Sequence, residues 1–261
     1  MRPLLPLLGT DEIARIEQSG AESGQRHHGT HVSEIHDHGL CGYNESEQLQ
    51  DCCDAAPHDA IDSNMELDPT HLIRILACFA IGAIPFAKVA MWGTGIDITK
   101  AGSKNPGFNN VLRVSTKPRA AVALAGDISK GFVALLLLAS GVPVWVAWAM
   151  GIAAVMGHCW SPFCGWNGGK GVATTVGVLL FLSWKITLAC LPLYVVGRWL
   201  GRRMGWKQEG AISSLTTMFV LATIVFVVES TPLAYVMFGI VLVRHIPNLR
   251  EIFGQPAKIL I

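Results

Sequence analysis

Long apolar runs separated by short polar gaps occupy the chain from residue 71 to residue 243. No Asp, Glu, Lys or Arg occurs between Lys130 and Lys170, and residues 171–197 and 210–243 carry one such residue each. Runs of about 20 apolar residues match the hydrocarbon core of a bilayer. With 51% hydrophobic and 15% charged residues, the chain is predicted to be an all-α, polytopic transmembrane helix bundle.

The placement of positive charge sets the expected topology. Basic residues gather in four segments, which are 93–118, the loop around Lys170, 198–207 and the tail from Arg244. The positive-inside rule places all four on the cytoplasmic side. Two short helices hinged near Trp184 and Lys185 would keep both Lys170 and Arg202 inside. We therefore expect about seven spans, with the amino terminus outside and the carboxyl terminus cytoplasmic. A five-span variant with residues 171–197 re-entrant is the alternative.

The first 64 residues have a different character, with 3 basic and 12 acidic side chains. This acidic, His-rich extension lacks apolar periodicity, so we expect it to be disordered, or to be a misassigned start because Met65 directly precedes the first apolar run. Residues 65–261 would then form the membrane-embedded domain. Transition-metal binding by the extension is an alternative, resting on His27, His28, His31, His36, His38, Cys41, Cys52 and Cys53. Their spacings match no standard site, so no metal site is predicted.

The first cytoplasmic loop is rich in Gly, Ser and Asn between Gly102 and Arg113. Glycines let backbone amides approach a ligand closely, and successive amides in a turn form an anion-binding nest. The guanidinium of Arg113 offers paired donors suited to phosphate. This composition predicts a phosphate-binding loop, although a plain turn-rich connector has the same residues.

The second loop reads Gly168-Gly169-Lys170-Gly171 and leads into the next apolar run. Such a sequence brings backbone donors, the positive end of a helix dipole and an ammonium to one point, which favours an anion. It is not the nucleotide-binding Walker A loop, because Cys164 replaces the first Gly and Gly171 replaces the Ser or Thr that would hold Mg²⁺. The loop therefore predicts a phosphate site without nucleotide hydrolysis.

Three further polar positions lie at or near membrane depth. Asp127 and Lys130 are three residues apart on one helical face, which predicts an ion pair with a mainly structural role. His158 lies near the cytoplasmic end of one span, and His245 and Asn248 share a face just after the last. Packing explains a lone His equally well, but convergence with two phosphate loops favours function. Because the charges lie in short gaps between apolar runs, nucleic acid is not an expected partner.

Taken together, residues 72–258 resemble the bacterial acyl-phosphate-dependent glycerol-3-phosphate acyltransferases. The family's first motif is matched at Gly102, Ser103, Asn105, Gly107, Asn110 and Arg113. The second motif is matched at Gly157, His158, Phe163 and throughout 168–174, and the third at Arg244, His245 and Asn248. Ser213 and Ser214 resemble a Ser-rich family segment. Departures from the family pattern occur at Lys104, Phe108, Asn109, Trp160, Ser161 and Ile246.

The resemblance implies an acyltransferase that uses acyl phosphate and sn-glycerol 3-phosphate to make 1-acyl-sn-glycerol 3-phosphate (lysophosphatidate) for phospholipid biosynthesis. It implies a multi-pass protein of the bacterial inner membrane in contact with lipid, with no metal or cofactor, and a soluble acyl-phosphate-forming enzyme as partner. The implied catalytic residues are His245, Lys170 and Asn248. The implied substrate-binding residues are Ser103, Asn105, Gly107, Asn110, Arg113, His158, Gly168, Gly169, Gly171, Thr174, Ser213 and Arg244.

On this interpretation Lys170 and the amides of residues 168–171 hold one phosphate, while Ser103, Arg113 and Asn248 hold glycerol 3-phosphate. His245 or a substrate phosphate oxygen would take the hydroxyl proton. The alternative is a membrane transporter or binding protein for a phosphate-containing lipid or metabolite. A transporter would be expected to show an internal repeat with paired broken helices, and no clear repeat is present in the sequence.

Overall fold

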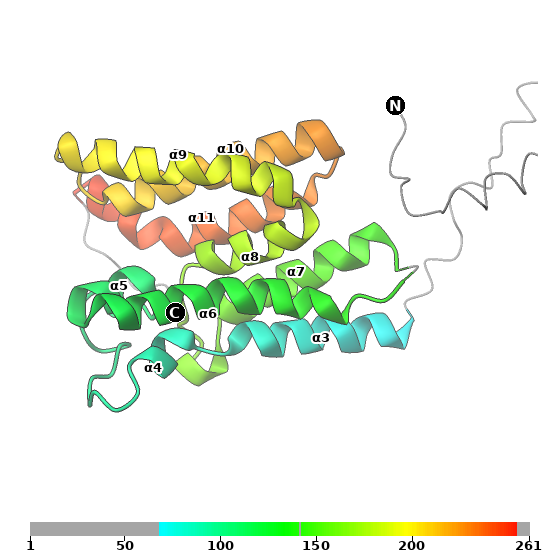
Figure 1. Cartoon of the computed structure of the whole chain (residues 1–261), viewed down its shortest axis with the longest axis horizontal. Helices are drawn as coiled ribbons and strands as arrows, with labels where there is room; N and C mark the ends of the chain where they lie inside the picture. Colours follow the sequence, from blue (N-terminus) through cyan, green and yellow to red (C-terminus); the bar gives the residue numbers. More distant parts are fainter. Residues whose placement is uncertain (1–67, 141, 255–261) are drawn as a thin grey trace, which may run out of the picture. The chain divides into compact units, whose positions relative to one another are not determined.

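A computed structural model describes residues 68–140 and 142–254, and every regular element within them is helical (Figure 1). The long helices are α3 (Pro69–Ala83), α6 (Lys117–Ala134), α7 (Val144–Cys159), α8 (Val172–Leu182), α9 (Trp184–Arg203), α10 (Glu209–Glu229) and α11 (Leu233–Ile252). The short ones are α4 (Phe86–Ala90), α5 (Phe108–Val114) and the 3₁₀ turns η3 (Leu135–Leu137) and η4 (Pro162–Cys164). The predicted acidic extension lies outside the described residues.

The predicted all-α membrane bundle is confirmed, and its helices differ from expectation in length. Within the described residues, four helical segments are long and apolar enough to cross a bilayer, namely Pro69–Ala90, Lys117–Leu137, Val144–Cys164 and Glu209–Glu229. Of the two helices expected to be short, α8 has 11 residues but α9 has 20, so that expectation is wrong for α9. The hinge falls at Ser183, next to the predicted position. The count of seven spans and the orientation of the termini stay predictions.

The first membrane-spanning segment, Pro69–Ala90, is interrupted within its length. α3 ends at Ala83 and α4 begins at Phe86, because Pro85 has no N–H with which to continue the helix. The carbonyl groups freed by this break find side-chain donors from other helices. Ser161 Oγ donates to Ala83 O over 2.6 Å, and Lys130 Nζ donates to Ile84 O over 2.7 Å. The break therefore ties α6 and the end of α7 to the first span.

Glycine permits two very close helix crossings. A Cβ added to Gly82 of α3 would overlap the carbonyl oxygen of Ala154 in α7, and one at Gly177 of α8 would overlap that of Ile128 in α6. In a membrane, close backbone approach at small residues supplies the packing that the hydrophobic effect supplies in water. These crossings fix α7 and α8 against the first half of the chain.

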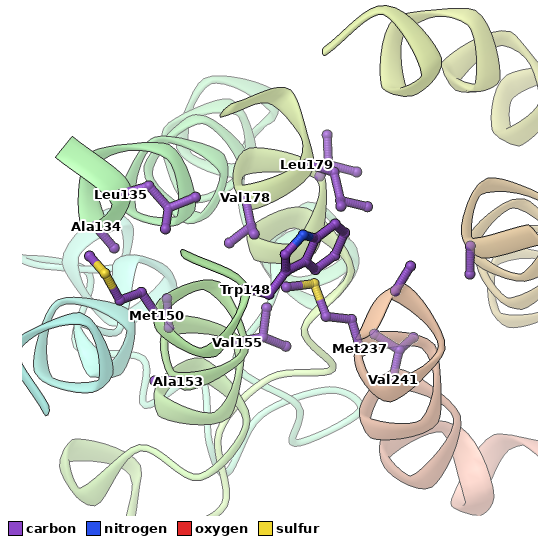
Figure 2. Close-up of a cluster of buried hydrophobic side chains, with 14 of the residues drawn as sticks. Ala134, Leu135, Trp148, Met150, Ala153, Val155, Val178, Leu179, Met237 and Val241 are labelled. Carbon is purple, nitrogen blue, oxygen red and sulfur yellow. The ribbon is translucent and has the colours of Figure 1, made fainter. Parts of the chain in front are cut away.

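A buried apolar cluster joins α7 to α8 and α11 (Figure 2). Trp148 of α7 is 2% exposed and lies among side chains that include Val178 of α8 and Met237 of α11 (Figure 2). Val241, one turn beyond Met237, is fully buried in the same cluster. Because α7, α8 and α11 share this core, the polar residues at their ends keep a fixed spacing.

The polar loops meet at one end of the helices. Successive long helices run in alternating directions, which brings the loop before α5, the loop before α8 and the α9–α10 turn to the same end (Figure 1). Lys88 Nζ donates to Phe163 O over 2.8 Å, and Arg198 Nη1 donates to Asn109 Oδ1 over 2.6 Å. The two predicted phosphate loops therefore share a face, as the distribution of positive charge indicated.

Candidate active site

The first two glycines of the second loop are fixed by the end of α7. Gly168 N donates to Cys159 O over 3.0 Å, and Gly169 N donates to His158 O over 3.1 Å. A Cβ on Gly169 would overlap the imidazole of His158, so only glycine fits there. These two amides are not free donors. The expectation that the amides of Gly168 and Gly169 would bind a phosphate is therefore wrong, because α7 already accepts both hydrogen bonds.

The carbonyl groups of the same loop are held by Arg244 of α11. Its Nη2 donates to Gly168 O over 2.6 Å and to Asn167 Oδ1 over 2.9 Å, and its Nε donates to Gly169 O over 3.1 Å. The guanidinium carbon also lies 5.8 Å from the centroid of the Trp160 ring, within cation–π range. Arg244 therefore anchors the loop to α11.

Free anion-binding donors lie one step further along, where α8 begins. Gly171 caps α8 with a φ of 86°, a left-handed conformation that glycine adopts without strain. The first amides of an α-helix have no acceptor within the helix and carry its positive dipole end. The ammonium of Lys170 directly precedes this terminus. The second loop thus presents an anion site built from Lys170 and the start of α8.

Lys170 is half-buried near two other cationic side chains. Burial lowers its pKa to about 8, and the positive charges of Arg244 and Arg113 act in the same direction, against a smaller opposing effect of Glu251. Charged residues near the first loop and on α11 therefore act on the ammonium of Lys170 in the second loop. Crowding of positive charge that lowers a lysine pKa is relieved when a phosphate binds.

The first loop is shaped by Asn110 of α5, which is 1% exposed. Its Oδ1 accepts from Ser103 N over 2.8 Å, and its Nδ2 donates to Ala101 O over 2.9 Å and to Ile98 O over 3.2 Å. The polar atoms of Asn110 thus hold the loop. The side chains of Ser103 and Arg113 stay exposed.

A small cavity lies where the two loops meet. Pro106, which lies between the half-buried Asn105 and Gly107 of the first loop, lines it together with Gly168, Gly169 and His158. Residues of both loops therefore line the same cavity.

The predicted ion pair lies on the inner side of this cavity. Lys130 Nζ lies 2.9 Å from Asp127 Oδ1, and His158 Nδ1 lies 3.4 Å from the same oxygen. All three side chains are at most 6% exposed. The Asp127–Lys130 pairing is confirmed, and it supports the His158 ring on which Gly169 rests.

α11 brings His245 and Asn248 to the same end. His245 is 2% exposed, and its Nδ1 lies 2.7 Å from Val241 O. Since a carbonyl oxygen only accepts, Nδ1 carries the proton and Nε2 has a free lone pair. A Cβ added to Gly171 would lie 3.5 Å from a methyl group of Val241, so the turn of α11 that precedes His245 lies beside the start of α8. Asn248 Nδ2 donates over 2.7 Å to Gln208 Oε1, a contact that no sequence motif indicated.

Comparison with known proteins identifies the class to which this arrangement belongs. A sequence model described as glycerol-3-phosphate acyltransferase matches residues 72–255. The chain belongs to this family. A glycerol-3-phosphate acyltransferase of Rubrobacter xylanophilus is 33% identical over 189 residues, covering 69% of this chain and 90% of the relative. One of Sulfurimonas denitrificans is 34% identical over 195 residues, covering 70% and 93%.

Solved structures of an acyltransferase of the same name show the same fold. Two crystal structures of PlsY (YgiH), an integral membrane glycerol 3-phosphate acyltransferase, superpose on this chain with a TM-score of 0.62. The glycerol 3-phosphate form is 29% identical in sequence, and the match covers 73% of this chain and 96% of that structure. The lysophosphatidic acid form is 28% identical, and the match covers 73% of this chain and 95% of that structure. The family indicated by the motifs is confirmed. This chain is therefore a multi-pass acyltransferase of lipid synthesis in the bacterial inner membrane.

Two expected site residues of this acyltransferase serve helix packing in the structure. Ser213 is 3% exposed, donates to Glu209 O of its own helix over 2.7 Å and packs against Gly197 of α9. Thr174 is fully buried beside Gly131 at the α6–α8 crossing. Within residues 68–140 and 142–254, no three His, Cys, Asp or Glu side chains converge as a metal site requires.

Proposed function

We propose that this protein transfers an acyl group from acyl phosphate to sn-glycerol 3-phosphate, releasing 1-acyl-sn-glycerol 3-phosphate and inorganic phosphate. The observation that carries the proposal is the half-buried ammonium of Lys170 at the start of α8, which lies near enough to Arg113 and Arg244 for their charges to lower its pKa. Both substrates bear phosphate, and this group of positive charges offers partners to both. The names of the relatives supply glycerol 3-phosphate as the acceptor.

The two phosphates take different partners in this proposal. Lys170 and the first amides of α8 hold the phosphate of the acyl donor, because they form a fixed, half-buried anion site. Ser103 and Arg113 are exposed on the first loop and hold the phosphate of glycerol 3-phosphate. Asn110 supports this second site through the loop backbone.

The chemical step needs no covalent enzyme intermediate, because an acyl phosphate is already activated. A glycerol hydroxyl attacks the acyl carbonyl carbon, the new ester C–O bond forms, and the bond from that carbon to the phosphate oxygen breaks. The hydroxyl proton passes to His245 Nε2, whose lone pair is free, or to a phosphate oxygen of a substrate, in which case His245 orients the hydroxyl. Lys170 neutralises charge on the departing phosphate.

This chemistry also indicates the partner enzyme and the position of the site relative to the membrane. A soluble enzyme that forms acyl phosphate supplies the donor at the cytoplasmic face. The protein has seven spans, with its amino terminus outside and the site on the basic cytoplasmic side. The acyl chain lies among the apolar helices while both phosphates stay at the polar end. Neither a metal nor a cofactor is required by the step.

The test is an assay of purified protein with labelled glycerol 3-phosphate and three rival donors, namely acyl phosphate, acyl-CoA and acyl carrier protein. We expect labelled lysophosphatidate with acyl phosphate alone. Product formed equally well from acyl-CoA or acyl carrier protein would refute the donor. Binding of glycerol 3-phosphate without labelled lysophosphatidate from any donor would instead favour a transport or binding role.

A further inference from the structure

Gln208 joins the α9–α10 turn to the end of α11. After α9 the chain reverses at Gly205, with Trp206 N donating to Gly201 O over 2.8 Å, and Gln208 then caps α10 with a φ of 59°. A positive φ is unfavourable for a glutamine and persists where surrounding contacts hold it. Here the contacts are two side-chain hydrogen bonds to α11.

Both hydrogen bonds are short and reach residues three apart on α11. Gln208 Nε2 donates to Glu251 Oε2 over 2.6 Å, and Gln208 Oε1 accepts from Asn248 Nδ2 over 2.7 Å. The half-buried Asn248 thus receives a partner from a turn that lies 40 residues earlier in the chain. Neither Gln208 nor Glu251 belongs to a motif that the sequence made conspicuous.

The chemistry of these groups fixes the orientation of both amides. A carboxylate only accepts hydrogen bonds, so Gln208 must turn its nitrogen toward Glu251. Its oxygen then faces Asn248, which must present its own nitrogen. Asn248 Oδ1 is consequently left as a free acceptor, beside the second N–H of Nδ2. An acceptor pairs with a hydroxyl group and repels a phosphate oxygen.

We infer that Gln208 is a positioning residue that turns Asn248 Oδ1 toward the 2-hydroxyl of glycerol 3-phosphate, so that this turn sets the acceptor specificity. The inference rests on the proposed function. It also follows from the position of His245, which precedes Asn248 by three residues and has a free lone pair at Nε2. Two acceptors on one helical face match two hydroxyl groups of the substrate, the reacting one and its neighbour.

This role separates Asn248 from the phosphate-binding residues. The sequence grouped Asn248 with Ser103 and Arg113 as residues that hold glycerol 3-phosphate. In the present inference its Oδ1 accepts from a glycerol hydroxyl, which a phosphate oxygen cannot replace as donor. Gln208 itself needs no contact with substrate, because it acts by holding Asn248.

The experiment compares glycerol 3-phosphate with 3-hydroxypropyl phosphate, which lacks the 2-hydroxyl. Gln208→Met keeps the side-chain length but removes both hydrogen bonds. We expect its kcat/KM for glycerol 3-phosphate to fall about 3- to 10-fold, the worth of one misplaced hydrogen bond, while kcat/KM for the analogue stays unchanged. Arg202→Met is the matched control, because Arg202 in the same region pairs with Glu209 alone among the described residues and should leave both values unchanged.

A charge swap tests the amide orientation directly. Gln208→Glu combined with Glu251→Gln lets the carboxylate at 208 accept from Asn248 and from the new amide at 251, so discrimination should return. In an Asn248→Ala background, Gln208→Met should cause no further loss.

The inference would be overturned if Gln208→Met lowered kcat/KM equally for both acceptors. It would also be overturned if the variant melted at a lower temperature but still discriminated between the two acceptors. In either case Gln208 would only stabilise the packing of α10 against α11. A wild-type protein inactive on glycerol 3-phosphate with every donor would overturn the proposed function, and the inference with it.

Discussion

The depressed pKa of Lys170 makes the acyl-donor site sensitive to mildly alkaline pH. With a pKa of about 8 in the unliganded protein, the ammonium is about 90% charged at pH 7, half charged at pH 8 and about 10% charged at pH 9. Phosphate binds the charged form and raises the pKa again, so binding above pH 8 requires uptake of a proton. We therefore expect kcat/KM for acyl phosphate to be level near pH 7 and to fall toward a tenfold loss per pH unit above 8.

Substitutions identify the group responsible for that fall. Lys170→Met should remove one charge-assisted contact worth about 1.5–3 kcal/mol, which is roughly a 10- to 150-fold loss of kcat/KM at pH 7. The variant should also lose the break near pH 8. Lys170→Arg keeps a charge throughout this range, so its profile should stay level to pH 9 even if its activity is lower.

The assay is the initial rate at low acyl phosphate, measured from pH 6.5 to pH 9.5 at constant ionic strength. The second ionisation of a phosphate group is largely complete at the start of this range. A level wild-type profile would contradict the lowered pKa of Lys170, and with it the burial and the nearby positive charges that lower it. A break near pH 8 that persists in Lys170→Met would show that another group titrates there.

Three substitutions elsewhere test the packing described above. Gly169→Ala should displace the second loop and lower kcat/KM about 100-fold, whereas normal activity would mean that the imidazole contact is not a constraint. Gly177→Ala should destabilise the protein at the α6–α8 crossing by about 1–3 kcal/mol in thermal unfolding. Gly239→Ala is its control, because an added methyl group there meets no atom within 4 Å. Equal melting temperatures for the two variants would contradict the close packing at Gly177. Asp127→Asn should cost about 3–5 kcal/mol by leaving Lys130 buried without its partner, and adding Lys130→Met should recover part of that loss, so an additive double variant would argue against the ion pair.

The second loop combines local flexibility with external restraint. Glycines allow the tight path between α7 and α8, yet the amides are bound by α7 and the carbonyl groups by Arg244. A loop held from both sides keeps Lys170 and the start of α8 in place before substrate arrives. Preorganised donors of this kind require little rearrangement when charge develops in the reaction.

The sequence by itself determined the environment, the helices and the reactive loops. Long apolar runs demand a bilayer, because they leave too few charges for a soluble surface. Gly-Gly-Lys-Gly before a helix and the His245–Asn248 spacing are local patterns, and they led to the correct family. One misjudged helix is α9, where Arg198, Arg202 and Arg203 suggested a loop but lie within the helix. Long cationic side chains can extend from a helix end to the polar interface, so charge did not mark the boundary.

Only the tertiary structure decided which polar atoms are free to act. The amides of Gly168 and Gly169 are used by α7, and Arg244 reaches its loop partner Gly169 across 75 residues of sequence. The orientation of Asn248 depends on Gln208, a residue with no motif around it. Hydrogen bonds of this kind depend on how distant helices pack. A sequence shows which donors and acceptors a chain possesses, but their partners are fixed only when the bundle closes.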